Sequence, residues 1–179
     1  WYSLTHIHPE FLSQVVYGLP ELYREKIKSA QGVANPGCYP TSVILALAPL
    51  MKTDWIELDS IISDSKSGVS GAGRKTSITT QFSEANEGVA PYNLANHRHT
   101  PEIEQELSCL AGKPLKISFS PHLIPMSRGM LSTIYINLKN KLKDEDLIEH
   151  YKNFYTNEYF VRVLDKNRFA STHSVTGSN

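Results

Sequence analysis

Apolar and polar residues recur along this 179-residue chain with the periods of short helices and strands. Segments with apolar residues three or four apart, between capping and breaking residues, are predicted as helices: 9–16, 20–28, 38–51, 100–112 and 144–154. Segments rich in β-branched and aromatic residues are predicted as strands: 31–34, 55–64, 116–124, 130–138 and 159–164. A hairpin is expected to join the strands at 116–124 and 130–138.

The order of these elements indicates an α+β fold, with helices on one face of a mixed, mostly antiparallel sheet. The length suits one domain with a sizeable core. Between the predicted strand 55–64 and the helix at 100 lie a glycine-rich loop, 66–74, and a polar, irregular stretch, 76–96. The second is long for a connector, and such loops inside compact domains are usually functional.

Charge and composition exclude several classes of partner. Eighteen basic residues balance eighteen acidic ones, so nothing favours nucleic acid or an anionic membrane. No apolar run approaches the roughly 20 residues of a membrane span. Two cysteines are too few for a disulfide scaffold and fit a reducing, cytoplasmic compartment. The chain opens on Trp1 without Met and stops after Val175 without a closing element, so we expect a piece of a longer protein.

The segment Asn35–Thr41 places Cys38 where a loop turns into an apolar helix, with Gly37 before it and Pro40 in the first turn. Unpaired N–H groups and the helix dipole at such a position favour a thiolate. The same N–H groups could hold an oxyanion. A lone cysteine is more often buried and inert, but the glycine and proline residues around Cys38 at the helix start favour a nucleophile. Cys109, among Leu107 and Leu110, is expected to be structural.

Two histidines flank an arginine at His97, Arg98 and His99, just before the predicted helix at Thr100. Imidazole titrates near neutrality, so this segment is a candidate acid–base partner for Cys38. A solvated turn is the alternative. The pair lacks the further local ligands that a zinc site needs, so no metal is expected.

The glycine-rich loop Lys66–Arg74 has the spacing G-x-x-G-x-G, the reverse of a dinucleotide fingerprint, and extended chain rather than a helix follows it. It is better interpreted as a backbone cradle for an anion, assisted by Lys66, Ser67, Ser70 and Arg74. A plain surface loop is an equal alternative.

Five segments together closely resemble the N-acetyl-γ-glutamyl-phosphate reductase family of arginine biosynthesis: Val16–Glu21, Ala34–Thr41, Lys66–Arg74, His97–Ile103 and Pro121–Met130. The match covers nearly all of the chain. The resemblance implies an NADPH-dependent reduction of N-acetyl-γ-glutamyl phosphate to the semialdehyde and phosphate, through a cysteine thioester.

The resemblance also implies the roles of the site residues. Cys38 is expected as the nucleophile, with His97 or His99 as the acid–base catalyst. Arg98 and Glu102 are expected to position the substrate. The loop is expected to line the site near nicotinamide and phosphate, with Ser67, Ser70 and Arg74 binding substrate and Gly68, Gly71 and Gly73 approaching NADP(H).

The family is similar to aspartate-semialdehyde and glyceraldehyde-phosphate dehydrogenases, which pair a Rossmann domain with an α/β catalytic domain. The resemblance therefore implies that residues 1–179 form the catalytic and dimerisation domain of a homodimer or homotetramer. The Rossmann domain is expected before residue 1 and a closing segment after Asn179, so the fragment alone is expected to be inactive.

Three other functions remain open: a related acyl-phosphate or semialdehyde dehydrogenase, a thiol hydrolase or transferase using Cys38 with His97 or His99, and a non-catalytic interaction domain.

Overall fold

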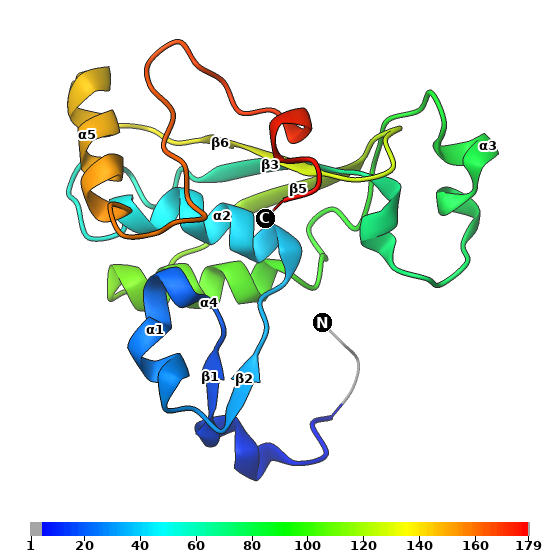
Figure 1. Ribbon diagram of the computed structural model, residues 1–179, viewed down its shortest axis with the longest axis horizontal. Helices are drawn as coiled ribbons and strands as arrows, with labels where there is room; N and C mark the ends of the chain where they lie inside the picture. Colours follow the sequence, from blue (N-terminus) through cyan, green and yellow to red (C-terminus); the bar gives the residue numbers. More distant parts are fainter. Residues whose placement is uncertain (1–4, 179) are drawn as a thin grey trace.

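A computed structural model describes residues 5–178 and contains a four-stranded mixed sheet in the order β4-β5-β3-β6 (Figure 1). Central strand β3 pairs in parallel with β5 and antiparallel with β6, and β4 pairs antiparallel with β5. The α+β class predicted from the sequence is confirmed. The strand bounds are Ile62–Ser67 for β3, Ala90–Pro91 for β4, Ser118–Leu123 for β5 and Met130–Tyr135 for β6.

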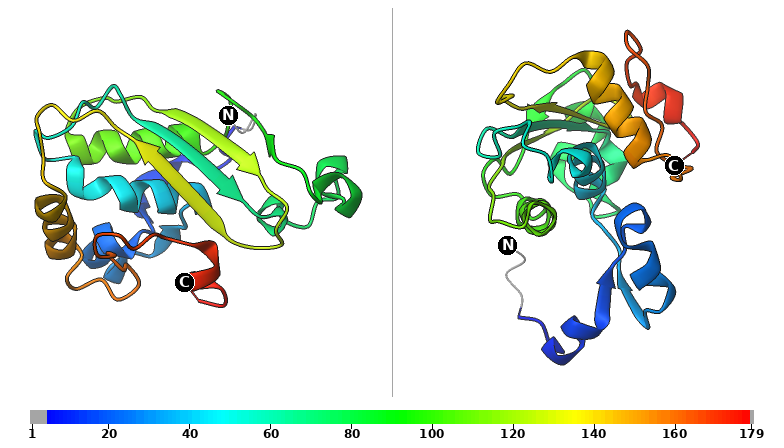
Figure 2. Two further views of the ribbon diagram at one scale, coloured as in Figure 1. Left: turned by 90° about the horizontal axis from the view of Figure 1, so that it is seen from above. Right: turned by 90° about the vertical axis from the view of Figure 1, so that its left-hand side faces the viewer.

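Helices α2 (Cys38–Leu47) and α4 (Thr100–Ala111) lie side by side against one face of this sheet (Figures 1 and 2). Their facing side chains form the centre of the core and are at most 1% exposed: Val43, Ile44, Leu47, Ile103 and Leu107. Each such side chain contributes roughly 1.5–3 kcal/mol by leaving water. Helix α2 continues as a 3-10 turn, η2 (Ala48–Leu50).

A layer of serine hydroxyls joins α2 to the sheet. Ser42 of α2 bonds to Ser132 of β6 at 2.8 Å, Ser132 bonds to Ser65 of β3 at 2.7 Å, and Ser65 bonds to Ser63 at 3.2 Å. Each of these four serine hydroxyls has a hydrogen-bond partner, which offsets the free-energy cost of burying it. Because these side chains are small, α2 packs close to β6.

The C-terminal end of α2 is covered by α5 (Asp144–Phe154). The hydroxyls of Tyr151 and Tyr155, the residue that follows α5, donate to the carbonyl oxygens of Ala46 and Leu45. His150 Nε2 lies 2.7 Å from the carbonyl oxygen of Pro49. The last carbonyls of a helix have no partner within it, so α5 satisfies groups that would otherwise be orphaned.

A separate unit precedes Cys38. Strands β1 (Val15–Tyr17) and β2 (Gly32–Ala34) run parallel, joined by α1 (Pro20–Lys28), and project away from the main sheet beside α4 (Figure 2). Parallel pairs are normally parts of larger sheets covered on both faces. Here Val15 and Val33 are 37% and 49% exposed.

The remaining short elements lie at the edges of the molecule. Most belong to the arm 69–96, which projects from one end of the main sheet (Figure 1). Their bounds are Pro9–Gln14 for η1, Val69–Ala72 for η3, Ile78–Thr80 for η4, Phe82–Ala85 for α3 and Thr172–Val175 for η5.

The predicted hairpin between 116–124 and 130–138 is wrong. Strands β5 and β6 form near the predicted positions, but β3 lies between them. The predicted strand 55–64 is displaced: pairing runs over Ile62–Ser67, into the predicted loop, and Ile56 makes only one isolated bridge, to Leu138. Buried serines in β3 explain the error, because hydroxyl hydrogen bonding satisfies side chains that the hydrophobic pattern assigns to a loop.

Two further predictions need correction. The helix expected over 9–16 is a 3-10 turn that ends before strand β1. No strand forms at 159–164 in the described chain, where Tyr159 and Phe160 are 82% and 59% exposed. Without a neighbouring strand edge, the β propensity of aromatic residues does not produce a strand.

Candidate active site

Cys38 is the first residue of α2, as its sequence context predicts, and its thiol is exposed. Gly37 is the N-cap, and its carbonyl oxygen accepts both the N–H and the hydroxyl of Thr41 at 3.0 and 2.9 Å. In a first turn the N–H groups have no partner within the helix. The thiol therefore lies at the positive end of a helix and is open to solvent.

Gly37 lies between two side chains from the start of α4. A Cβ atom at this position would lie 2.6 Å from His99 Nε2. The N–H of Gly37 donates to Glu102 Oε1 at 2.8 Å. Only glycine fits against the imidazole, so this residue allows the cysteine loop and the histidine segment to lie together.

His97 and His99 are buried, at 5% and 6% exposure, with ring centroids 4.8 Å apart. Burial, as the largest cause, and the charge of Arg98 together lower the pKa of both imidazoles to about 4, and His99 contributes to the lowering at His97. Both rings are therefore neutral at pH 7. The backbone N–H of His99 donates to His97 Nδ1 at 3.1 Å, so the proton of neutral His97 lies on Nε2.

The two histidines differ in the hydrogen bonds that their ring nitrogens make. His97 Nδ1 accepts a hydrogen bond, whereas His99 Nδ1 is buried and makes none to the described residues. His99 Nε2 is the ring nitrogen beside Gly37. Of the two, His99 is therefore the one in contact with the residue that precedes the thiol.

Aromatic side chains hold both imidazoles. The Tyr39 ring lies 5.8 Å from that of His97 and 6.1 Å from that of His99, and Phe119 lies 5.4 Å from His97. Tyr92 donates its hydroxyl to that of Tyr39 at 3.0 Å. Sequence inspection missed Tyr92, which lies in the irregular 76–96 stretch without a motif around it.

The glycine-rich loop is not the backbone cradle that the sequence suggested. The N–H groups of Gly68, Val69 and Ser70 donate to carbonyl oxygens of residues 126–129 at 2.9–3.1 Å. Those donors are unavailable to an anion. Gly68 is needed for this packing, because a Cβ there would lie 2.8 Å from the carbonyl oxygen of Met126. A Cβ on Gly71 would lie 2.8 Å from Ser67 Oγ, whereas Gly73 has space around it and a positive φ of 79°.

The other predicted site residues differ in their exposure and partners. Ser67, buried at the end of β3, donates its hydroxyl to the carbonyl oxygen of Gly68. Ser70, Arg74 and Arg98 are exposed. Lys66 pairs with Asp64, so its charge is already partly neutralised.

Cys109 is exposed on α4, which corrects the expectation of a structural role. Its neighbours Leu107 and Leu110 are on the core-facing side, where Leu107 has no exposed surface. Both thiols are therefore accessible to reagents, and Cys109 offers an internal reference for Cys38.

Within residues 5–178 no three His, Cys, Asp or Glu side chains are placed to hold a metal ion. Over the same range no helix has the length and apolar character needed to cross a membrane.

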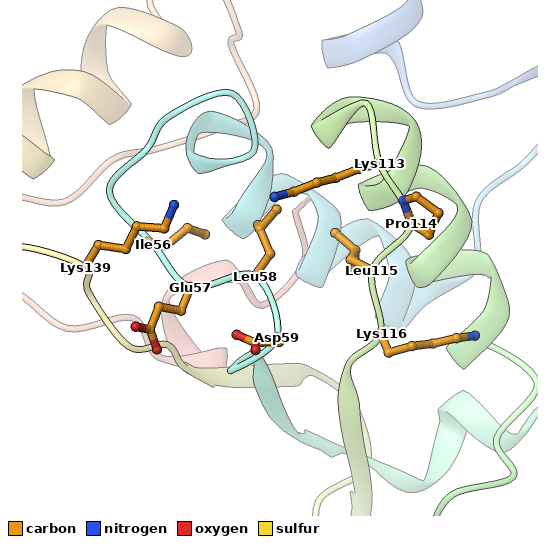
Figure 3. Close-up of a pocket in the computed structure, with 9 residues that line it drawn as sticks. All are labelled: Ile56, Glu57, Leu58, Asp59, Lys113, Pro114, Leu115, Lys116 and Lys139. Carbon is orange, nitrogen blue, oxygen red and sulfur yellow. The ribbon is translucent and has the colours of Figure 1, made fainter.

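A large pocket of about 710 Å³ lies away from Cys38 (Figure 3). Its lining comes from Ile56–Asp59 and Lys113–Lys116, which follow α2 and α4, and from Lys139. It therefore lies toward the opposite end of α2 from the thiol. Figure 3 shows Lys113 extending across this pocket toward Leu58.

Fold and site together define an α+β domain in which an exposed thiol begins a helix and a histidine lies against the residue before it. A family model described as the semialdehyde dehydrogenase dimerisation domain matches residues 38–179, and the chain belongs to this family. Residues before Cys38, including the β1–α1–β2 unit, lie outside the matched region.

Among curated proteins, the chain is 56% identical to N-acetyl-gamma-glutamyl-phosphate reductase of Acetivibrio thermocellus and 54% identical to that of Moorella thermoacetica. Both matches cover the whole chain but 52% of the relative. The chain thus spans about half the length of these relatives. The resemblance noted in the sequence is confirmed.

Solved structures with a similar fold are aspartate semialdehyde dehydrogenases. One from Vibrio cholerae, complexed with ASA, has a TM-score of 0.63 at 13% identity over 92% of this chain and 55% of that one. Another from Candida albicans, with NADP, has a TM-score of 0.51 at 14% identity over 76% of this chain and 44% of that one. At these identities the likeness shows the fold alone.

Proposed function

We propose that the full-length protein reduces N-acetyl-γ-glutamyl phosphate to N-acetylglutamate 5-semialdehyde with NADPH, releasing phosphate, in cytoplasmic arginine biosynthesis. The observation that carries this proposal is the exposed thiol of Cys38 at the start of α2, with neutral His99 against the glycine that precedes it. The names of the relatives supply the substrate.

The first step is attack by the Cys38 thiolate on the acyl carbon of the substrate. The carbon–sulfur bond forms as the bond to the phosphate oxygen breaks, which leaves a thioester and inorganic phosphate. N–H groups in the first turn of α2 can hold the oxygen that becomes negative. Exposed Arg98 supplies a cation for the leaving phosphate.

The described residues do not fit the phosphates of NADP. The N–H groups of residues 68–70 already donate to backbone carbonyl oxygens of the protein. The absence of a side chain at Gly68 and Gly71 is explained by close packing, so neither glycine needs a cofactor to explain it. We therefore assign the phosphate site to the half of the full-length protein outside this chain, and only the nicotinamide end to the neighbourhood of Ser67 and Gly73. When bound, NADPH supplies the hydride that reduces the thioester.

His99 acts on the oxygen of the resulting thiohemiacetal. A neutral imidazole can donate its N–H to that oxygen while negative charge develops, and in the reverse direction it can accept the hydroxyl proton. Collapse of the thiohemiacetal breaks the carbon–sulfur bond while its hydroxyl proton returns to the imidazole, which releases the semialdehyde and regenerates the thiolate. His97 accepts the backbone N–H of His99 and so helps to orient it.

Residues 15–34 support the presence of a nucleotide-binding half. A two-stranded parallel sheet is not a stable structure by itself, and the matched family region begins after it. We propose that β1–α1–β2 continues a larger parallel sheet of the full-length protein. The family description further supports a homo-oligomer.

The test is an assay of the full-length protein with the acyl phosphate and NADPH, or in reverse with semialdehyde, NADP and phosphate. We expect acyl-phosphate-dependent loss of NADPH absorbance, abolished by Cys38→Ser and retained by the matched exposed-thiol variant Cys109→Ser. Near-normal reduction by Cys38→Ser would refute the covalent route. Release of phosphate without oxidation of NADPH would indicate a thiol hydrolase instead.

A further inference from the structure

Two Tyr–Glu hydrogen bonds connect α4 to the β1–α1–β2 unit, one helical turn apart. Tyr17 donates its hydroxyl to Glu102 Oε1 at 2.8 Å, and Tyr23 donates to Glu106 Oε2 at 2.7 Å. Burial, followed by the hydrogen bond to each glutamate, raises the pKa of both tyrosines, so both remain protonated donors. The two pairs are chemically alike.

They differ in the other partner of each glutamate: Glu106 Oε1 accepts from Gln105 Nε2, its neighbour on α4, at 3.2 Å. Glu102 Oε1 also accepts the backbone N–H of Gly37 at 2.8 Å, whereas no backbone group of the cysteine loop contacts Glu106. One oxygen of Glu102 therefore joins three segments: β1 through Tyr17, the first turn of α4, and the residue before Cys38. A carboxylate oxygen with two donors in place is strongly fixed.

We propose that Glu102 is a positioning residue for the nucleophile, and that Tyr17 holds it in place, rather than a group that binds substrate. The inference rests on the proposed function and adds a role to a residue outside the reacting atoms. Its physical basis is that the N–H of Gly37 cannot turn away while Glu102 holds it, so the Cys38 thiol and the N–H groups after it keep one orientation.

This arrangement predicts a separation between kcat and KM. Positioning groups lower the barrier of the chemical step, since a misplacement of about 1 Å can cost about a hundredfold in rate. Substrate ligands that act equally in ground and transition states change KM instead. In the full-length enzyme, Glu102→Ala is expected to lower kcat by about 10- to 100-fold, with KM for the semialdehyde within about twofold.

Conservative variants isolate the role. Glu102→Gln keeps an oxygen acceptor and is expected to retain at least about a third of kcat, whereas Tyr17→Phe removes one hydroxyl and is expected to lower kcat about three- to tenfold. Tyr23→Phe and Glu106→Gln are the matched controls. They weaken the twin contact and are expected to lower the unfolding temperature similarly while leaving kcat within about twofold.

A second measurement does not depend on turnover. Alkylation of Cys38 by iodoacetamide, referenced to Cys109 in the same molecule, is expected to slow at least about threefold in Tyr17→Phe, and not in Tyr23→Phe. A rise in KM with unchanged kcat in Glu102→Gln would overturn the proposal in favour of substrate binding. So would equal kcat and alkylation rates in Tyr17→Phe and Tyr23→Phe. Loss of the assigned reaction in the wild type would contradict the proposed function alone, because the alkylation comparison still decides the positioning role.

Discussion

At its C-terminal end the carbonyl oxygens of α2 accept hydrogen bonds from side chains at the end of α5. At its N-terminal end the Cys38 thiol is exposed, and the neutral imidazole of His99 lies against the preceding residue, Gly37. The same helix thus has one end whose backbone groups are satisfied internally and another whose groups remain available. The closed end contributes stability. In the proposed function the open, N-terminal end carries the chemistry, because a group already bonded to the protein cannot bond to a substrate.

The largest expected effect comes from closing the space at the open end. Gly37→Ala places a Cβ 2.6 Å from His99 Nε2, so the imidazole or the cysteine loop must move. We expect kcat of the full-length enzyme to fall by about a hundredfold or more. Gly88→Ala is the control, since its nearest contact is an ordinary 3.6 Å. Unchanged turnover in Gly37→Ala would show that the contact with His99 has no catalytic role.

The second largest effect is expected from acid, which should lower the stability of the protein through the two histidines near the N-terminal end of α2. Histidines in the unfolded chain take up protons near pH 6.5, whereas the folded His97 and His99, whose pKa is about 4, stay neutral. The unfolded state therefore binds more protons between these values, and stability is lost as pH falls from about 6.5 toward 4. Thermal unfolding of the full-length protein at pH 7, 6 and 5 measures this loss.

A matched variant assigns that pH dependence. His97→Asn removes one of the two titrating rings and is expected to make the unfolding temperature depend less steeply on pH between 7 and 5. An equally steep dependence in this variant would mean that other groups cause the acid destabilisation.

The smallest effect is expected at the closed end and in stability alone. Tyr155→Phe removes the donor to the carbonyl of Leu45, which costs about 1–3 kcal/mol in the free energy of unfolding. Turnover should stay within about twofold, since the open end is untouched. Tyr159→Phe is the control, because this ring is 82% exposed. A large loss of kcat in Tyr155→Phe without destabilisation would mean that the two ends are not independent.

The two ends also differed in how well the sequence predicted them. Gly37, Cys38 and Pro40 are local signals, so the helix start and its thiol were predicted correctly. The same holds for the α5 helix at 144–154. What α5 contacts was not predictable, because Tyr151 and Ala46 are 105 residues apart and nothing local specifies such a pairing.

The centre of the sheet shows the same limit. Strand β3 carries serines whose hydroxyls bond across the core, so its hydrophobic pattern is weak. Its insertion between β5 and β6 depends on pairing between residues that are far apart in the sequence. Ile62 pairs with Ser118, 56 residues away, and with Tyr135, 73 residues away. Adjacent strands in sequence favoured a hairpin, and the tertiary arrangement overrode it. Glu102 was singled out in the sequence as a candidate site residue, but its contacts to Gly37 and Tyr17 appear only in three dimensions.

The contacts between α5 and α2 have a consequence for biosynthesis of the polypeptide. A ribosome synthesises α2 more than 100 residues before the tyrosines that bond to its C-terminal end, at separations of 105 and 110. The carbonyl oxygens of Leu45 and Ala46 therefore lack their tyrosine donors until the chain has been synthesised past position 155. A nascent chain arrested before that point is expected to expose α2 to chaperones and proteases, so the environment of Cys38 would be completed only late in translation.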